Sequence, residues 1–164
     1  MVLEDDIYFL TSTCIMYLIV YFFPLILYHI LTLTNKISSL QNRENFSFFV
    51  LCVGGQSLQL ALNSQDHPLA ATVIYSGRLV TEKGILANIM WPVLGIFGDQ
   101  DRSISVDTVK AFELSLNSNG ITNEIYIYKG VGHAFANPSG ENYAPKETQD
   151  AWQKTLSFLN KLSS

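Results

Sequence analysis

Short apolar segments alternate with amphipathic helical patterns from about residue 46 to the C-terminus, and this alternation most constrains the fold. Four segments are predicted to be strands, because they are almost wholly apolar or rich in Ile and Tyr. These strands cover residues 46–51, 70–75, 92–97 and 124–128. Strands that are separated by helices predict an α/β domain with a mostly parallel sheet and helices on both faces.

Three helices are predicted between and after these strands. The first runs from Gly55 to Asn63, and the second ends near Gly120, because glycine is favoured just after a helix. The last helix covers about residues 146–162 and has one apolar stripe along its length. The stripe consists of Trp152, Thr155, Leu156, Leu159 and Leu162.

The first 45 residues differ from the rest of the chain. Residues 7–33 contain no Asp, Glu, Lys or Arg and exceed the ~20 apolar residues that cross a bilayer as a helix. We expect this run either to be a membrane helix or to pack into a protein core, with a polar linker after it. As a membrane helix, with Lys36 and Arg43 on its C-terminal side, it would leave residues 46–164 in the cytoplasm as a separate domain.

Charge and cysteine content exclude several functions. The chain has a net charge of −4 and no basic cluster, so nucleic acid is not an expected partner. Two cysteines in 164 residues indicate reduced thiols rather than a disulfide scaffold, and they lack the closely spaced partners of a zinc site. Cys14 lies in the apolar run and is predicted to be an inert buried thiol, whereas Cys52 lies in a different setting.

Three side chains with catalytic chemistry follow three of the predicted strands. Cys52 follows the first strand, Asp101 the third and His133 the fourth. In a parallel sheet, ligands gather beyond the carboxyl ends of the strands, so these side chains are expected near one another. Each one alone has a simpler explanation, as a small core residue or as part of a turn. Their order along the chain is what favours a shared site.

The arrangement of strand, Cys52, two glycines and helix is the arrangement of a nucleophile elbow. The N-terminus of the following helix favours negative charge, which helps to form a thiolate and to hold an oxyanion. His133 would accept the thiol proton, and Asp101 would orient and stabilise the imidazole. Nucleophile, acid and histidine also stand in the order expected of α/β-hydrolases.

Three segments resemble the signature regions of the dienelactone hydrolase family of α/β-hydrolases. They are Cys52-Val53-Gly54-Gly55, Gly98-Asp99-Gln100-Asp101 and Gly132-His133-Ala134-Phe135-Ala136-Asn137. The resemblance covers about residues 46–163. It implies a Cys-Asp-His triad that opens lactones such as carboxymethylenebutenolides or cleaves carboxylic esters, with no cofactor and no metal.

The resemblance also assigns individual roles. It makes Asp101 the triad acid, leaves Asp99 to shape the loop, and gives the backbone amide of Val53 to the oxyanion hole. Four further polar residues could line a substrate pocket or be ordinary turn and surface groups. They are Asn63, His67, Asn137 and Tyr143. His29 lies in the apolar run without a catalytic partner.

The chain departs from the family pattern at two places. Val50 stands where the elbow normally has glycine, and its branched side chain would crowd the turn. The strands that precede the nucleophile in the family have no counterpart in residues 1–45, so the N-terminal strands are expected to be missing. Arg78 and Arg102 have no assigned role. The alternative function is therefore an inactive, truncated and membrane-associated remnant, and no oligomeric state is predicted.

Overall fold

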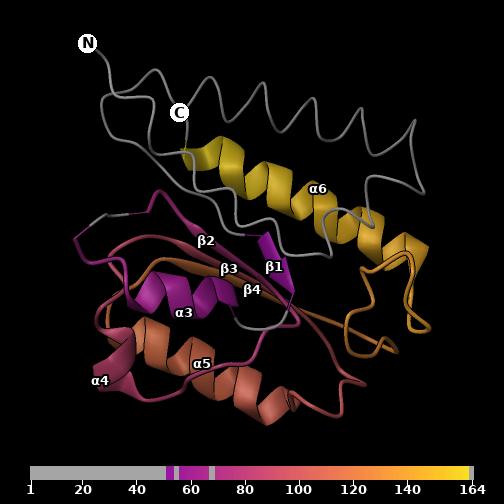
Figure 1. The fold of residues 1–164 in the computed structure, drawn as a ribbon, viewed down its shortest axis with the longest axis horizontal. Coiled ribbons are helices and arrows are strands. Elements are labelled where there is room, and N and C mark those ends of the chain that lie inside the picture. The colour runs from indigo at the N-terminus through magenta and orange to yellow at the C-terminus, as the bar shows by residue number, and fades with distance from the viewer. Residues whose placement is uncertain (1–50, 54–55, 67–68, 163–164) are drawn as a thin grey trace. The chain divides into compact units, whose positions relative to one another are not determined.

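The computed structural model describes residues 51–53, 56–66 and 69–162, all within one unit of the chain, Arg43–Ser164. Four strands form one sheet in which each strand lies parallel to its neighbours, in the order β1-β2-β3-β4 (Figure 1). Their bounds are β1 Leu51–Val53, β2 Thr72–Tyr75, β3 Val93–Gly98 and β4 Asn123–Tyr128. The predicted α/β fold with a parallel sheet is confirmed.

The helices lie on both faces of this sheet, as expected. Helices α3 (Gln56–Leu62), α4 (Lys83–Leu86) and α5 (Val106–Ser118) connect successive strands. Crossovers between parallel strands are right-handed, so a sheet whose strands follow chain order carries all its connections on one face. Helix α6 (Pro145–Leu162) has no following strand in the described sheet and covers the opposite face (Figure 1).

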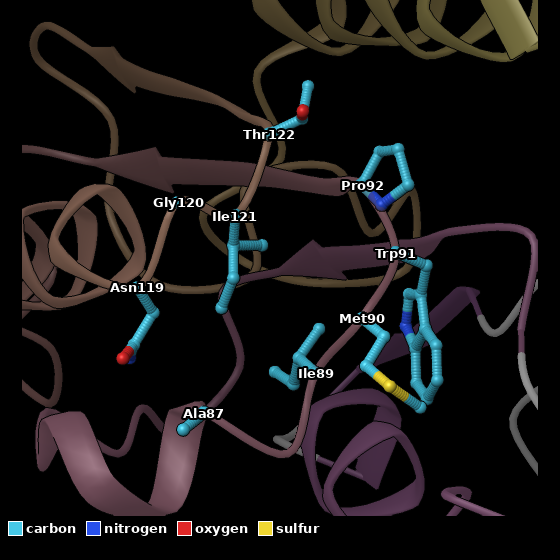
Figure 2. A pocket seen from close by; sticks show the side chains of 9 residues that line it. All are labelled: Ala87, Ile89, Met90, Trp91, Pro92, Asn119, Gly120, Ile121 and Thr122. Carbon is cyan, nitrogen blue, oxygen red and sulfur yellow. The ribbon is translucent and has the colours of Figure 1, made fainter.

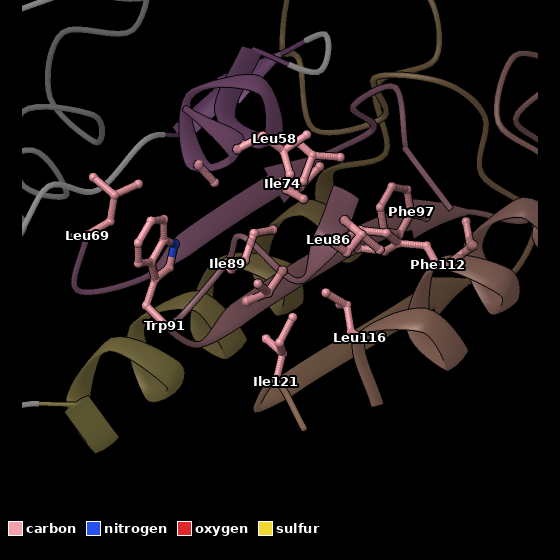
Figure 3. Packing of buried hydrophobic residues seen from close by; sticks show 14 of the residues in the cluster. Leu58, Leu69, Ile74, Leu86, Ile89, Trp91, Phe97, Phe112, Leu116 and Ile121 are labelled. Carbon is pink, nitrogen blue, oxygen red and sulfur yellow. The ribbon is translucent and has the colours of Figure 1, made fainter. Parts of the chain in front are cut away.

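Strand β3 is buried along its whole length because helices cover both faces. Its alternate residues Val93 and Phe97 belong to the hydrophobic core that also holds Phe112 and Leu116 of α5 (Figure 3). By the alternation of side chains along a strand, Leu94 and Ile96 face α6. Figure 3 shows side chains from all three connecting helices in the same core. The sheet centre is thus a rigid support for the loops at its ends.

Helix α5 begins and ends where its sequence indicates. Ser105 caps the N-terminus with its side chain, and Gly120 follows the last turn with a φ of +71°. The amide of Gly120 donates to Asn117 O and that of Ile121 to Leu116 O, each at 3.0 Å, which is the Schellman arrangement. Ile121 and Leu116 both join the core, so this cap directs the chain into β4.

Helix α6 lies on the sheet through a stripe that was only partly predicted. Thr155 and Leu159 are buried as expected, whereas Trp152, Leu156 and Leu162 are half-buried. Ala151 and Phe158 complete the buried stripe. The Tyr75 hydroxyl lies 2.8 Å from Thr155 Oγ1, which joins α6 to β2.

Several predictions fall on parts of the chain outside the described residues. They are the apolar run 7–33, the polar linker after it, the first five residues of the strand 46–51, and the single residues Cys14, His29, Val50 and His67. The division into segments 1–45 and 46–164 likewise stays a prediction. Among the helices of the described ranges, none is long and apolar enough to span a membrane.

Candidate active site

Asp101 and His133 follow β3 and β4, and their side chains are in contact. His133 Nδ1 lies 2.8 Å from Asp101 Oδ2. The Asp101 side chain has no exposed surface, whereas the His133 side chain is 41% exposed. The pair therefore has a buried acidic end and an imidazole that solutes can reach.

The second carboxylate oxygen of Asp101 is held by its own loop. Oδ1 accepts hydrogen bonds from the amide of Ser103 at 2.7 Å and from that of Ile104 at 3.0 Å. A buried carboxylate needs such partners, because burial without them is costly. A carboxylate only accepts hydrogen bonds, so His133 Nδ1 is assigned the proton between them. The lone pair of the imidazole then lies on Nε2, where a general base needs it.

Asp99 has a different set of contacts, although it stands only two residues away from Asp101. Its Oδ1 accepts from the amide of Gly130 at 2.7 Å and from Gln100 Nε2 at 3.1 Å. The bond to Gly130 connects the loop after β3 to the loop after β4, whereas the bond to Gln100 lies within the loop after β3. Asp99 thus has the contacts expected of a loop-shaping residue, and Asp101 has those expected of a triad acid.

The backbone of the histidine loop lies close to Gly98, the last residue of β3. A Cβ atom on Gly98 would lie 2.2 Å from the carbonyl oxygen of Val131, so only glycine fits there. The same carbonyl accepts the amide of Gln100 at 3.0 Å, and the amide of Asp99 donates to Tyr128 O at 2.9 Å. Backbone contacts therefore fix the histidine loop against the acid loop, which keeps the side chains of the pair in reach of each other.

Two residues that the sequence analysis did not identify hold the peptide group after His133. The amide of Ala134 donates to Ser76 Oγ at 3.2 Å, and Asn142 Nδ2 donates to the carbonyl of His133 at 3.0 Å. Ser76 directly follows β2 and is 3% exposed. Phe135 is fully buried and its ring lies 5.3 Å from that of Tyr128, so the loop is also anchored on the α6 face.

Cys52 lies inside β1, in register with Ile74 of β2, rather than directly after the strand. The prediction ended this strand at Leu51, directly before Cys52, but the ladder with β2 continues to Val53. The side chains of β1 are outside the described part of the structure. The roles of Cys52 as nucleophile and of the Val53 amide in an oxyanion hole therefore stay predictions.

The suggested pocket residues have local contacts where the structure describes them. Asn63 Nδ2 donates to the carbonyl of Gln59 at the end of α3. Asn137 Oδ1 accepts the amide of Ser139 in a turn, and Tyr143 is 37% exposed. These contacts are those of turn and surface residues, which is the simpler of the two interpretations.

A cavity of about 290 Å³ lies at the other end of the sheet (Figure 2). It is lined by the residues that lead into β3 and β4, among them Trp91, Pro92 and Ile121. The acid–histidine pair lies beyond the carboxyl ends of these strands, so this cavity is not part of the candidate site. In the described ranges, no group of three or more His, Cys, Asp and Glu side chains could hold a metal ion.

The parallel sheet, with an acid and a histidine after its last two strands, is that of an α/β-hydrolase. Comparison with known families gives a more specific result: the dienelactone hydrolase family matches residues 29–163. The chain belongs to the dienelactone hydrolase family. The match begins before residue 46, so it includes residues that the sequence analysis assigned to the apolar run and the linker.

Individual relatives agree with this assignment. A protein of Saccharolobus solfataricus named "Putative carboxymethylenebutenolidase" is 30% identical over 110 residues, which are 67% of this chain and 41% of the relative. A protein of the same name from Escherichia coli K12 is 30% identical to this chain, and the match covers 66% of this chain and 43% of the relative. This chain thus spans less than half the length of the curated relatives that it matches.

Solved structures show the same fold. The crystal structure titled "Putative Dienelactone Hydrolase" from Klebsiella pneumoniae has a TM-score of 0.57 and 29% identity, covering 63% of this chain and 46% of that one. A dienelactone hydrolase-like promiscuous phosphotriesterase from metagenomic libraries has a TM-score of 0.56 at 23% identity, which bears on the fold alone.

Proposed function

We propose that this chain hydrolyses a lactone or a carboxylic ester through a triad of Cys52, His133 and Asp101. The observation that carries the proposal is the 2.8 Å contact between His133 Nδ1 and the buried carboxylate of Asp101, beyond the carboxyl ends of two neighbouring strands. An imidazole held in this way is prepared to act as a base through Nε2. Membership of the dienelactone hydrolase family supports the same reaction class.

The path of the backbone supports Cys52 as the nucleophile. Val53, the next residue, lies in register with Tyr75 of β2. Tyr75 is followed by Ser76, whose hydroxyl accepts the amide of Ala134. The C-terminal end of β1 therefore lies beside Ser76, which holds the histidine loop. A nucleophile that transfers its proton to His133 has to lie at this position.

The first half of the proposed reaction forms an acyl-enzyme. His133 Nε2 takes the thiol proton of Cys52, and the sulfur attacks the carbonyl carbon of the substrate. The carbonyl electron pair moves to oxygen, and the Val53 amide would donate to the resulting oxyanion. When the carbonyl re-forms, the bond to the alkoxide breaks, and His133 returns the proton to that oxygen. In a lactone, the alcohol stays attached to the acyl group.

The second half releases the acid. Water loses a proton to Nε2 of His133 and attacks the thioester carbon, and the sulfur of Cys52 leaves as the thioester bond breaks. The product is the free acid, and the proton on His133 returns to the sulfur. Asp101 stays ionised and stabilises the imidazolium in both halves. A cysteine can act as a nucleophile only when it is not part of a disulfide, and a reducing compartment such as the cytoplasm keeps thiols in this reduced state.

Hydrolysis of p-nitrophenyl acetate and of an enol-lactone by the full chain tests the nucleophile. We expect Cys52→Ala to reduce kcat/KM by about 10³-fold or more, since removal of a triad member leaves only the other stabilising interactions. Cys14→Ala is the matched control, because it removes the other thiol of the chain, and it should retain the activity. Full activity in the Cys52→Ala variant would refute the proposal.

A second pair of variants tests the acid. Asp101→Asn should reduce kcat by up to about 10⁴-fold, because an amide no longer fixes the imidazole tautomer. Asp99→Asn makes the same chemical change two residues away, where the carboxylate bonds the amide of Gly130. A loss of kcat in Asp99→Asn as large as that in Asp101→Asn would contradict the assignment of Asp101.

A further inference from the structure

Two residues with unusual backbone conformations meet beside His133. Ser76 has a φ of 46° and Ala134 a φ of 55°, and they are the two non-glycine residues with positive φ in the part of the chain that the structure describes. In this region the Cβ atom of an ordinary residue comes too close to the backbone, so such conformations persist only where the surroundings impose them. Both belong to loops at the carboxyl end of the sheet.

A hydrogen bond joins these two residues, although 58 positions separate them. The amide of Ala134 donates to Ser76 Oγ at 3.2 Å. Ser76 itself is fixed to the sheet, because its amide donates to the carbonyl of Ile96 in β3 at 2.9 Å. The bond therefore ties the histidine loop to the sheet centre.

The opposite end of the same peptide group is also held. The carbonyl of His133 and the amide of Ala134 belong to one planar unit, and Asn142 Nδ2 donates to that carbonyl at 3.0 Å. A Cβ atom on Gly132 would lie 3.3 Å from Asn142 Cγ, so glycine at 132 lets the amide side chain approach closely. With both ends held, the plane of the peptide is fixed, and so is the direction in which the His133 side chain leaves the backbone.

The imidazole needs this second constraint. Its side chain is 41% exposed, so packing around the ring is limited. The hydrogen bond to Asp101 fixes the position of Nδ1, but the ring can still turn about that point and swing Nε2 away from the substrate. A misplacement of about 1 Å can reduce a rate by about 100-fold. The backbone from which the ring extends must therefore be held as well.

We propose that Ser76 and Asn142 are positioning residues that clamp the peptide between His133 and Ala134, so that Nε2 faces the reacting thiol. This inference rests on the proposed function for its effect on rate. Ser76 is buried and Asn142 is exposed. A buried hydrogen bond competes less with water than an exposed one, so Ser76 contributes more to the clamp than Asn142.

Ser76→Ala, Asn142→Ala and the double variant test the clamp in the full chain. The double variant should lose about 10- to 100-fold in kcat while KM changes by less than about threefold. The matched controls are Ser115→Ala, which removes a hydroxyl donating to Thr81 O at 2.6 Å, and Asn119→Ala, which removes an amide donating to Lys83 O at 2.8 Å. Each control removes a hydrogen bond between a Ser or Asn side chain and the backbone, between α5 with its C-cap and residues 81–83, away from the histidine loop. They should keep kcat within about twofold at a similar loss of thermal stability.

The position of the imidazole gives a readout that does not need turnover. The proton between His133 Nδ1 and Asp101 should give a resolved, slowly exchanging NMR signal in the unaltered chain, and this signal should broaden or disappear in the double variant. Unchanged ring signals together with kcat within twofold of the unaltered chain would overturn the clamp. If the chain shows no Cys52-dependent hydrolysis, the proposed function fails, and the NMR signal alone decides the clamp: its loss supports the inference and its persistence refutes it.

Discussion

Gly98→Ala directly probes the contact between the acid loop and the histidine loop. The added Cβ would lie 2.2 Å from Val131 O, 2.9 Å from Val131 C and 3.0 Å from Gly132 O. All three atoms belong to the backbone, so no flexible side chain can move aside. Cβ atoms essentially never come within 3.0 Å of a non-bonded atom, so the backbone at Gly98 and that at Val131 must separate by at least 0.8 Å, the difference between 3.0 and 2.2 Å.

This displacement occurs two residues before His133, and it acts on both stability and rate. Overpacking of a buried site costs about 1–3 kcal/mol. For a domain of this size, 1 kcal/mol corresponds to about 2–4 °C in Tm, so the expected decrease is about 2–12 °C. A shift approaching 1 Å in the position of the general base, His133, also reduces kcat by up to about 100-fold.

Thermal unfolding followed by circular dichroism measures the first effect, and ester hydrolysis measures the second. Gly84→Ala is the matched control: nothing lies within 4 Å of the Cβ it would add, and Gly84 lies in α4, where alanine is the better helix former by about 1 kcal/mol. We expect the control to raise Tm and Gly98→Ala to lower it. A Gly98→Ala variant with the Tm of the unaltered chain and an intact His133–Asp101 NMR signal would show that the loops do not depend on this contact.

Three further predictions concern stability. Burial raises the pKa of Tyr75 to about 12, so between pH 10 and 12 the unfolded chain releases this proton while the folded chain retains it. The free energy of unfolding should then fall by about 1.4 kcal/mol per pH unit, and urea titrations of Tyr75→Phe should show a smaller fall. Ser57 Oγ is buried and, among the described residues, has no hydrogen-bond partner. Ser57→Ala should therefore raise the free energy of unfolding, measured by urea titration, by about 1 kcal/mol. A lower free energy of unfolding would contradict this. Gly120→Ala forces a φ of +71° on a residue with a Cβ atom, and it should lower the free energy of unfolding by about 1–2 kcal/mol in the same assay. An unchanged free energy of unfolding would mean that the helix end can rearrange.

The main elements of the fold were predictable because their sequence signals are local. Strand β3 is a run of apolar residues that helices cover on both faces, and α5 ends at a glycine whose positive φ the cap requires. Helix α4 was not predicted, because four residues that include Gly84 show no helical periodicity. The end of β1 was misplaced, since glycines mark a turn in the sequence but do not show how far the ladder with β2 extends.

The acid–histidine pair was predictable for a different reason. Asp101 and His133 each follow a strand, and parallel neighbours bring the ends of successive strands to the same edge. The residues that hold the histidine loop were not predictable in this way. The side chains of Ser76 and Asn142 each make one hydrogen bond to the backbone, and a bond between a serine hydroxyl and an amide 58 residues away leaves no pattern in a single sequence.

The strand order has a consequence for how the chain folds during synthesis. Each of β2, β3 and β4 pairs with the strand that precedes it in the chain, so a nascent chain can add one strand–helix unit at a time as it emerges from the ribosome. Asp101 emerges 32 residues before His133, and a carboxylate buried without a partner would oppose docking of β3. The amides of Ser103 and Ile104 already satisfy one of its oxygens from within the same loop. The acid therefore has local hydrogen-bond partners before its histidine emerges from the ribosome.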